Sequence, residues 1–546
     1  MESRNVLTIP FLASESYRKN GEKKAMGFVG EEVITYNELK STVDAIIAML
    51  EKYSVGHGDR VAILSGSMPN WGATYLAVTS MGAVIVPILP DFTPEEISNV
   101  LMHSGSKVLF VSTALTAKVA GFRSETLRAV FTADDFAVLS GYNGTGFAPS
   151  LRPEKEYHVA EEDLAAIIYT SGTTGKSKGV MLTHKNICFT AQKCLTLQKI
   201  ENDDVFLSIL PLSHTYEQTL GLMLPLFNGA AIYYLRKAPT PAVLLPALEE
   251  VRPTIMLTVP LIMEKIYFNK IAATFNKKKI VSMLYHTVPF RKLLNRIAGK
   301  KLYQTFGGRL KFFGIGGAKL NHTVEQFLID AKFPYAIGYG LTETSPLLAG
   351  TIVGNPRLGS TGRAMEGVTL RIENPDPVTG EGEVWARGEN VMRGYYNEPE
   401  KTAEVITPDG WFRTGDLGTI GSDGFLSIKG RLKNMIVGSS GENIYPEEIE
   451  SVINDFGHVI ESLVVQKKGK LVAMVHLNID ELQAKYHHMK KEFSEHAELK
   501  VDEYLEEIRK YVNSRVNKFS QLQVVMLQPE PFQKTATLKI KRFLYY

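Results

Sequence analysis

Cysteine is almost missing from this sequence, which has two, Cys188 and Cys194, among 546 residues. So few thiols in so long a chain exclude the disulfide framework of small secreted domains, and they indicate a reducing compartment. Five residues separate the two cysteines, and no second pair exists to complete a zinc site. We therefore expect two ordinary thiols in a cytoplasmic protein.

Long hydrophobic runs are missing as well. The N-terminal segment, residues 1–24, contains no apolar stretch of signal-peptide length. Residues 61–90 carry no charge, but glycine, proline, serine and asparagine divide them into short pieces. Because a transmembrane helix needs about 20 continuous apolar residues, we interpret this segment as a buried strand, a helix and a second buried strand. Such a unit is typical of a largely parallel sheet.

Acidic residues are absent from residues 265–324, where thirteen lysines and arginines lie. Since the net charge of the whole chain is +3, the remainder carries −10. A basic segment can bind nucleic acid, an anionic membrane or an anionic ligand, and neither an aromatic ladder nor a zinc finger supports nucleic acid here. Residues 280–300 mix apolar and basic positions, as an interfacial helix does. A solvated helical surface explains them equally well.

What the sequence does contain is a loop rich in glycine, serine and threonine, YTSGTTGKSKGV at residues 169–180. It is not a Walker A loop, because Thr170 stands where that pattern needs its first glycine and an apolar run, 179–183, follows where a helix should begin. Consecutive backbone N–H groups, hydroxyls and lysines can still surround a phosphate. The pattern predicts a phosphate loop between two strands, the first at 164–170.

The longer stretch YTSGTTGKSKGVMLTH, residues 169–184, resembles the phosphate loop of the adenylate-forming superfamily of acyl-CoA synthetases, peptide-synthetase adenylation domains and firefly luciferase. Ser177 replaces the usual proline. The resemblance implies that Thr170 also binds the metal ion. The implied contacts to ATP are Thr170, Ser171, Gly172, Thr173, Thr174, Gly175 and Lys178.

Two further motifs are similar to segments of the same superfamily. LPLSHTYE at 210–217 resembles the start of the acyl pocket in long-chain fatty acyl-CoA synthetases, which implies that His214 binds substrate beside the α-phosphate. GIGGA at 314–318 resembles the loop beside adenine, where glycine lets the backbone lie flat against the base. The implied nucleotide contacts of that loop are Gly316, Gly317 and Ala318.

The motif GYGLTETSP at 338–346 is more specific. The resemblance implies that Tyr339 stacks on adenine, that Thr342 contacts the α-phosphate in catalysis, and that Glu343 is catalytic by holding Mg²⁺. An aromatic ring offers a stacking face, and a carboxylate beside a triphosphate needs a cation between them. The implied nucleotide contacts of this motif are Gly338, Tyr339 and Gly340.

The motif GWFRTGDLG at 410–418 resembles the ribose-binding segment, in which Asp416 accepts hydrogen bonds from both ribose hydroxyls through its two oxygens. In the run that begins at Gly430, the resemblance implies that Arg431 contacts the nucleotide and that Lys433 is a hinge. Gly441 lies in the SSGEN turn, which the resemblance makes part of the tunnel for the thiol substrate.

The last motif, PFQKTATLKIKRFLYY at 531–546, resembles the segment that carries the catalytic lysine of adenylation. That lysine aligns with Lys539. Leu538 stands where the family has glycine, and leucine resists backbone angles that glycine permits. Because the lysine and the apolar Ile540 after it are retained, we predict that Lys539 is catalytic.

The resemblance implies an α/β fold with two domains. Residues 1–430 would form a large N-terminal domain of layered α/β subdomains plus a β region, which binds AMP and the acyl group. Residues 431–546 would form a small, mobile α+β lid. The implied reaction uses ATP and Mg²⁺ to convert a long-chain fatty acid to acyl-AMP, and then transfers the acyl group to CoA with release of AMP.

Alternative functions stay open from the sequence. The protein could be an acyl-AMP ligase that loads an acyl carrier protein, or a non-catalytic homologue that binds acyl or nucleotide ligands; a luciferase-like oxygenase would need a special substrate. The expected partners are the fatty acid, ATP and CoA, with no nucleic acid. A homodimer and peripheral contact of residues 265–311 with the inner face of the membrane are further hypotheses.

Overall fold

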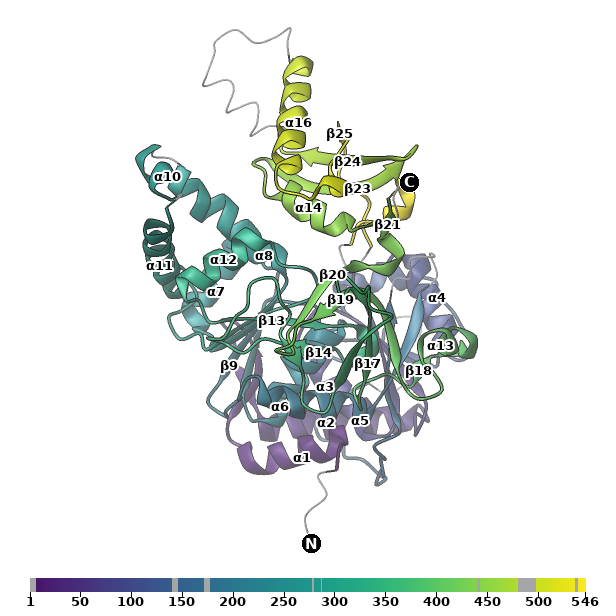
Figure 1. The fold of residues 1–546 in the computed structure, drawn as a ribbon. Helices are drawn as coiled ribbons and strands as arrows, with labels where there is room; N and C mark the ends of the chain where they lie inside the picture. The colour runs from purple at the N-terminus through teal and green to yellow at the C-terminus, as the bar shows by residue number, and fades with distance from the viewer. Residues whose placement is uncertain are drawn as a thin grey trace.

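The computed structural model describes residues 6–139, 146–170, 177–276, 279–285, 287–438, 442–479, 497–535 and 539–546. Figure 1 shows a large N-terminal domain and a small C-terminal domain stacked on one end of it. The expected α/β fold with a small C-terminal domain is therefore confirmed. Within the ranges given, no helix combines the length and the apolar character that crossing a bilayer requires.

The first of two large sheets in the N-terminal domain has nine strands in its described part, in the order β15-β14-β13-β12-β11-β9-β10-β1-β2. The strands from β13 to β1 are parallel to their neighbours, and β2, β14 and β15 are antiparallel. In sheet order the bounds are Arg363–Ala364, Leu347–Gly350, Tyr335–Gly340, Phe312–Ile315, Ile255–Thr258, Val205–Ser208, Ala231–Tyr234, Lys24–Phe28 and Val33–Thr35.

The second sheet has seven strands in its described part, in the order β18-β8-β7-β4-β3-β5-β6. The strands from β7 to β6 are parallel, and β8 and β18 are antiparallel at one edge. The strands predicted on either side of the phosphate loop are confirmed as β7 and β8. In sheet order the bounds are Gly394–Tyr395, Lys178–Thr183, Leu164–Thr170, Val84–Ile88, Arg60–Leu64, Val108–Val111 and Ala129–Thr132.

Helices cover both sheets, and α3 lies between them. The α3 helix contacts β1 of the first sheet and β4 of the second, and its Trp71 and Tyr75 are fully buried. A helix buried on both sides needs apolar residues all round, which explains the uncharged segment 61–90. The helices of this domain are α1 (Ile9–Asn20), α2 (Tyr36–Lys52), α3 (Pro69–Ser80), α4 (Pro94–Ser104), α5 (His184–Lys193), α6 (Leu224–Phe227), α7 (Pro241–Val251), α8 (Pro260–Ile266), α9 (Ala273–Asn276), α10 (Lys279–Tyr285), α11 (Val288–Thr305), α12 (His322–Ala331) and α13 (Pro399–Val405).

Residues 280–300, which the sequence likened to one interfacial helix, are divided between two helices, α10 and α11. The reason is Pro289, which lies in the first turn of α11. Proline is accepted at a helix start but removes a hydrogen bond inside a helix, so it begins a new helix here. In Figure 1 the two helices extend to one side of the N-terminal domain.

A four-stranded antiparallel sheet, β16-β17-β19-β20, leads to the C-terminal domain. Its first two strands, β16 and β17, pair antiparallel through a short connection after Glu373. The last strand runs directly into a 3₁₀ turn, η6 (Leu432–Asn434), at the junction of the two domains. The strand bounds are Thr369–Glu373, Gly382–Arg387, Phe412–Ile420 and Leu426–Arg431.

The C-terminal domain is a small α+β unit with its own core. Strands β23 and β24 are antiparallel, and β25 joins β24 in parallel. The core includes Ile449 and Ile453 of α14 and Ile508 and Val512 of α16. Here α14 begins at Pro446, and a proline with glutamates in the first turn favours a helix start. The bounds are β21 (Ile436–Val437), β22 (Asn443–Ile444), α14 (Pro446–Asn454), β23 (Val459–Lys467), β24 (Lys470–Leu477), α16 (Ala497–Asn513) and β25 (Val524–Leu527).

Candidate active site

The carboxylate of Asp416 is held from two sides. Asp416 and Arg431 are opposite each other in the register of β19 and β20, and Arg431 Nε lies 2.8 Å from Asp416 Oδ1. The hydroxyl of Tyr339 donates to Asp416 Oδ2 at 2.7 Å. Burial raises the pKa of Asp416, while Arg431 and Tyr339 oppose that rise. Each oxygen of an ionised carboxylate has two lone pairs, so this group can accept further hydrogen bonds from a diol.

Tyr339 is positioned by a tight return of the chain. It lies near the end of β13, and β14 comes back antiparallel beside it. A Cβ atom on Gly340 would lie 1.7 Å from the carbonyl oxygen of Pro346, so only glycine fits there. A Cβ atom on Gly338 would lie 3.0 Å from Leu347 Cδ1. The two glycines therefore let the strands approach, which brings Tyr339 up to Asp416.

Glu343 lies in the 3₁₀ turn η5 (Thr342–Thr344), directly after Thr342. The hydroxyl of Tyr395 donates to Glu343 Oε1 at 2.9 Å. Tyr395 comes from β18, which pairs with β8, and Lys178 Nζ lies 4.6 Å from the centre of the Tyr395 ring. Thr170 is opposite Lys178 in the hairpin of β7 and β8. The two ends of the phosphate loop are thus close to Glu343.

Lys539 enters this site from the C-terminal domain. It lies near enough to Glu343, Asp416 and Arg431 for their charges to act on its ammonium group. Surrounding protein atoms and Arg431 lower the pKa of Lys539, and the two carboxylates oppose that change. Lys539 is exposed. A cation of the C-terminal domain is therefore near two carboxylates of the N-terminal domain, one in the η5 turn and one in β19.

His214 lies in the loop after β9, near enough to Lys539 for that charge to act on it. Burial lowers the pKa of His214 to about 4, and the charge of Lys539 adds to the effect. The imidazole is therefore neutral at neutral pH. Two residues on, the Tyr216 ring packs against Gly316, where a Cβ atom would lie 3.2 Å from it. Gly317 has a φ of +84° and makes the turn that leads to Ala318.

The strand end that carries Lys539 is fixed by hydrogen bonds and ion pairs. The Thr535 N–H donates to the Lys539 carbonyl at 2.8 Å, and the Lys539 N–H donates to Thr535 Oγ1 at 3.2 Å. Before this loop, Lys534 pairs with Glu461 at 2.5 Å. After it, Arg542 donates to Glu450 of α14. These contacts hold both ends of the loop, whereas Leu538 itself lies outside the described residues.

A model of the AMP-binding enzyme family matches residues 13–396. The chain belongs to the AMP-binding enzyme family. A long-chain-fatty-acid–CoA ligase of Drosophila melanogaster, heimdall, is 30% identical over 494 residues, which are 82% of this chain and 72% of that protein. A (methyl-dioxo-octahydroindenyl)propanoyl:CoA ligase of Rhodococcus jostii is 29% identical over 482 residues, 84% of this chain and 85% of that protein. Both relatives join an acid to CoA.

Solved structures of the same fold agree with this assignment. ATP-bound MatB from Rhodopseudomonas palustris has a TM-score of 0.76 to this chain and 24% identity, and the match covers 98% of each chain. This likeness extends over nearly the whole of both chains, so the N-terminal and C-terminal domains share the fold of that structure.

The other predicted site residues of this AMP-binding enzyme are placed as follows. Lys433 is exposed in η6, at the junction of the two domains and beside the site rather than in it. The phosphate-loop residues Ser171, Gly172, Thr173, Thr174 and Gly175 lie outside the described residues, as does Gly441.

The donors present suit a metal ion that arrives with the nucleotide. Within the described ranges, no cluster of three or more histidine, cysteine or acidic side chains could hold a metal by itself. Glu343 is a single carboxylate, and Mg²⁺ typically takes one or two carboxylates together with substrate phosphates and water. Thr170 and Glu343 therefore fit magnesium bound as part of Mg·ATP.

Tyr395 is a site residue that sequence reasoning missed. It reaches Glu343 because β18 adds to the edge of β8, and the segment before β18 is tied to α5 by Asn186. The amide of Asn186 donates to the carbonyl oxygens of Glu389 at 2.7 Å and Val391 at 3.0 Å. The paired residues are about two hundred positions apart in the sequence. No local pattern around Tyr395 predicts such contacts.

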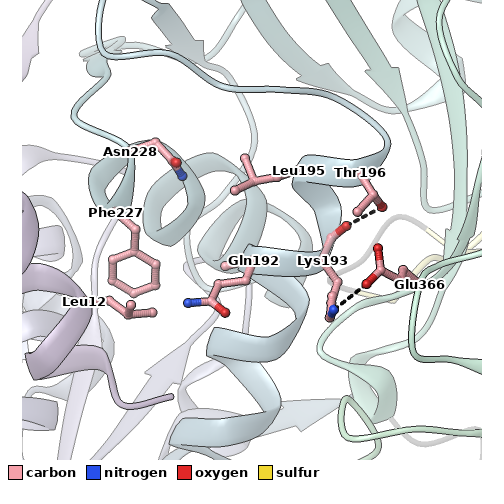
Figure 2. A pocket seen from close by; sticks show the side chains of 9 residues that line it. Leu12, Gln192, Lys193, Leu195, Thr196, Phe227, Asn228 and Glu366 are labelled. Atoms are coloured by element: carbon pink, nitrogen blue, oxygen red, sulfur yellow. Dashed lines mark hydrogen bonds and ion pairs between the residues drawn. The ribbon is translucent and has the colours of Figure 1, made fainter. Parts of the chain in front are cut away.

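A second cavity lies away from this cluster, between α1, α5 and α6, at the end of the N-terminal domain opposite the C-terminal domain (Figure 1). Figure 2 shows Lys193 paired with Glu366 at 2.6 Å on one side and Leu12 and Phe227 on the other. The polar side chains of Gln192, Thr196 and Asn228 also line this cavity, and its one acid, Glu366, is already paired with Lys193. We therefore assign the chemistry to the cluster around Asp416, Glu343 and Lys539.

Proposed function

We propose that this protein is an ATP-dependent ligase that converts a long-chain fatty acid to acyl-AMP and then to acyl-CoA, with release of pyrophosphate and AMP. The observation that supports this most is the approach of Lys539 to Glu343, Asp416 and Arg431. In the proposed roles Asp416 binds the ribose, Tyr339 stacks on adenine, and Glu343 with Thr170 holds the magnesium that arrives with ATP. Thr342 and the phosphate loop contact phosphate oxygens.

The first step needs help because a carboxylate must attack the α-phosphorus of an already anionic nucleotide. Bringing two anions together costs Coulomb energy, most of all where little water remains. Lys539 lowers this cost by placing a cation beside the negative charge that builds in the transition state. The substrate carboxylate forms a bond to phosphorus, and the bond to pyrophosphate breaks in line. Positioning by the surrounding residues supplies much of the remaining acceleration.

The second step needs the thiol of CoA to reach the acyl carbon. We propose that the C-terminal domain, residues 431–546, turns about Lys433, withdraws Lys539 and brings the turn that contains Gly441 to the site. The thiol then attacks the acyl carbon, and AMP leaves. One site is thereby used for both steps.

The long-chain acid is the finer part of the proposal. It rests on the LPLSHTYE segment and on the fatty-acid substrate in the name of the Drosophila relative. The name of the Rhodococcus relative gives a bicyclic propanoate instead. The chain length is therefore the property to measure first.

The test is a pyrophosphate-release assay with Mg·ATP and carboxylic acids of increasing chain length, with and without CoA. We expect release to rise with chain length and thioester to form when CoA is added. Release with a holo carrier protein but not with CoA would favour the carrier-loading ligase. Binding of ATP with no pyrophosphate from any acid would favour the non-catalytic homologue and overturn the proposal.

We further propose that α10 and α11 lie on an anionic membrane, where fatty acid is dissolved. Along α11, exposed Leu293 and Ile297 alternate with exposed Lys292, Arg296 and Lys300. Their neighbours Met283, Val288 and Phe290 are also exposed. No acidic residue from 265 to 324 offsets these charges, so the surface is complementary to acidic lipid headgroups.

Vesicle binding tests this surface. Changing Lys292, Arg296 and Lys300 to glutamine should weaken binding to phosphatidylglycerol vesicles by roughly fivefold per charge. Lys19, Lys40 and Lys199 are exposed on other elements. Changing them to glutamine removes the same net charge and should weaken vesicle binding much less. Equal binding of both triple variants would contradict the proposal. The homodimer also stays a prediction, which light scattering would test.

A further inference from the structure

The C-terminal domain touches the N-terminal domain through a pair of polar side chains, Asn321 and Asp455. The amide of Asn321 donates to Asp455 Oδ1, and Thr323 Oγ1 donates to Asp455 Oδ2 at 3.4 Å. Asn321 precedes α12 of the N-terminal domain, and Asp455 follows α14 of the C-terminal domain. These two helix ends therefore meet across the boundary between the domains.

Asn321 is held so that its amide can face only outward, to the other domain. Its side-chain oxygen accepts from the N–H groups of Thr323 at 2.9 Å and Val324 at 3.2 Å, which caps α12. Its own N–H donates to Glu264 of α8 at 3.0 Å. Asn321 is 5% exposed. With the oxygen used for the cap, the NH₂ group remains for Asp455.

The negative charge of Asp455 interacts more favourably with the end of α12 than with the end of its own helix, α14. A carboxylate at the C-terminal end of α14 faces the negative end of that helix dipole, which is unfavourable. The same carboxylate lies against the N-terminal end of α12, where the dipole and the Asn321 amide favour a negative charge. Burial raises the pKa of Asp455, and the hydrogen bonds from Asn321 and Thr323 oppose that rise. The favourable interactions of Asp455 therefore lie mostly across the domain boundary.

This contact exists in the orientation that brings Lys539 to the nucleotide site. Other contacts across the same boundary are the hydrogen bond from Tyr445 to Glu381 at 2.6 Å and the exposed pair of Lys319 and Glu448 at 3.5 Å. We propose that Asn321 and Asp455 form a latch that holds the C-terminal domain in its adenylating orientation. They are positioning residues for Lys539, and the latch must open before CoA reacts. This inference rests on the proposed two-step reaction.

The test measures the two steps separately. Asn321→Asp keeps the cap of α12, because aspartate caps as well as asparagine, but it places a second carboxylate against Asp455. We expect the rate of acyl-adenylate formation to fall about tenfold, since a charge-assisted hydrogen bond is lost and like charges face each other. Conversion of supplied acyl-adenylate to thioester should be unchanged or faster, which also shows that the C-terminal domain is folded.

Exchange of the pair supplies the decisive comparison. In Asn321→Asp with Asp455→Asn, the new amide can donate to the new carboxylate, so adenylation should return to within about threefold of the natural chain. The matched control is Glu448→Gln, which removes the pairs of Glu448 with Lys319 and Lys429 across the same boundary. Exposed pairs of this kind contribute little, so both steps should be unchanged. If the double variant is no faster than Asn321→Asp, or if both steps fall equally, the latch is refuted.

A readout independent of activity separates this inference from the proposed function. Amide hydrogen exchange at the start of α12 and the end of α14 should be faster in Asn321→Asp than in the natural chain, and slower again in the double variant. If the natural chain releases no pyrophosphate, the proposed function fails while hydrogen exchange still decides whether the latch exists. Unchanged exchange in Asn321→Asp would refute the latch whatever the activity.

Discussion

At the scale of single residues, the site depends on a cation that is far from its partners in sequence. Lys539 is near Asp416, Arg431 and Glu343, and the pKa of Lys539 is lowered by the protein atoms around it and by Arg431. A lysine with this environment loses part of its hydration before any substrate arrives. The ammonium is therefore ready to stabilise negative charge without first reorganising its surroundings.

We expect Lys539→Ala to reduce acyl-adenylate formation by about 10²–10³-fold, the effect of removing one preorganised transition-state partner. Thioester formation from supplied acyl-adenylate should keep most of its rate, because Lys539 is proposed to leave the site in that step. Pyrophosphate exchange and thioester formation measure the two steps. Lys541→Ala, two positions away, is the control and should behave like the natural chain.

Glu217 is a second residue with an unusual environment. It is 1% exposed at the start of the π-helical turn η3 (Glu217–Met223), and burial raises its pKa to about 8. Ser208 donates to Oε1 at 2.6 Å, while Oε2 has no hydrogen-bond partner among the described residues. The carboxyl group is therefore protonated at neutral pH in the folded chain.

Because Glu217 is protonated in the folded chain, the free energy of unfolding depends on pH. Between the unfolded pKa of 4.5 and the folded pKa of about 8, the folded chain binds more protons, so its stability falls as pH rises through that window. The slope is at most about 1.4 kcal/mol per pH unit. We expect the melting temperature of Glu217→Gln to rise relative to that of the natural chain as the pH goes from 5 to 8. Above pH 8 the difference between the two should stay constant. The same substitution at exposed Glu125 should show no such trend.

At the scale of elements, the sequence predicted the strands and helices that are defined locally. The strands on both sides of the phosphate loop and the β-α-β unit of 61–90 follow from apolar runs and from turn residues. Residues 280–300, which the sequence likened to one interfacial helix, are divided between two, because Pro289 begins a second helix. The edge strand β18 was not predicted at all, since it has two residues and is defined only by its pairing with β8.

This edge strand has a functional consequence that can be measured. Tyr395→Phe removes the hydroxyl that donates to Glu343 but leaves β18 and its ring beneath Lys178 in place. Loss of one hydrogen bond to a charged group should raise the KM for Mg·ATP by roughly tenfold or more, with a smaller change in kcat. Steady-state kinetics with varied Mg·ATP measure this. An equal rise for Tyr396→Phe would indicate a general packing effect and contradict the role of Tyr395.

At the scale of the whole molecule, the position of the C-terminal domain decides which residues form the site. The described contacts between Asn321 and Asp455 and between Tyr445 and Glu381 join the two domains through hydrogen bonds rather than a large apolar surface. Interfaces of this kind allow domains to move. In the proposed reaction the orientation seen here serves adenylation, and the second step requires another.

A crosslink can test this requirement. Cys188 and Cys194 are buried, and burial raises the pKa of both thiols, so neither should react with a thiol reagent. Cysteines placed at Asn321 and Asp455 and joined by a short cleavable linker should keep adenylation and lose thioester formation. A reducing agent should restore the second step. Thioester formation that survives complete crosslinking would show that the domain need not turn.

The sequence by itself determined the local motifs: a glycine-rich phosphate loop between two strands, and the segments whose family resemblance implied Asp416, Arg431 and Lys539 as site residues. Short-range patterns suffice for these because backbone geometry and burial act over a few residues. Only the tertiary structure decided that Tyr395 meets Glu343, that Asn321 meets Asp455 and that Lys539 reaches Asp416. Such contacts depend on packing between segments far apart in the chain, which no local pattern encodes.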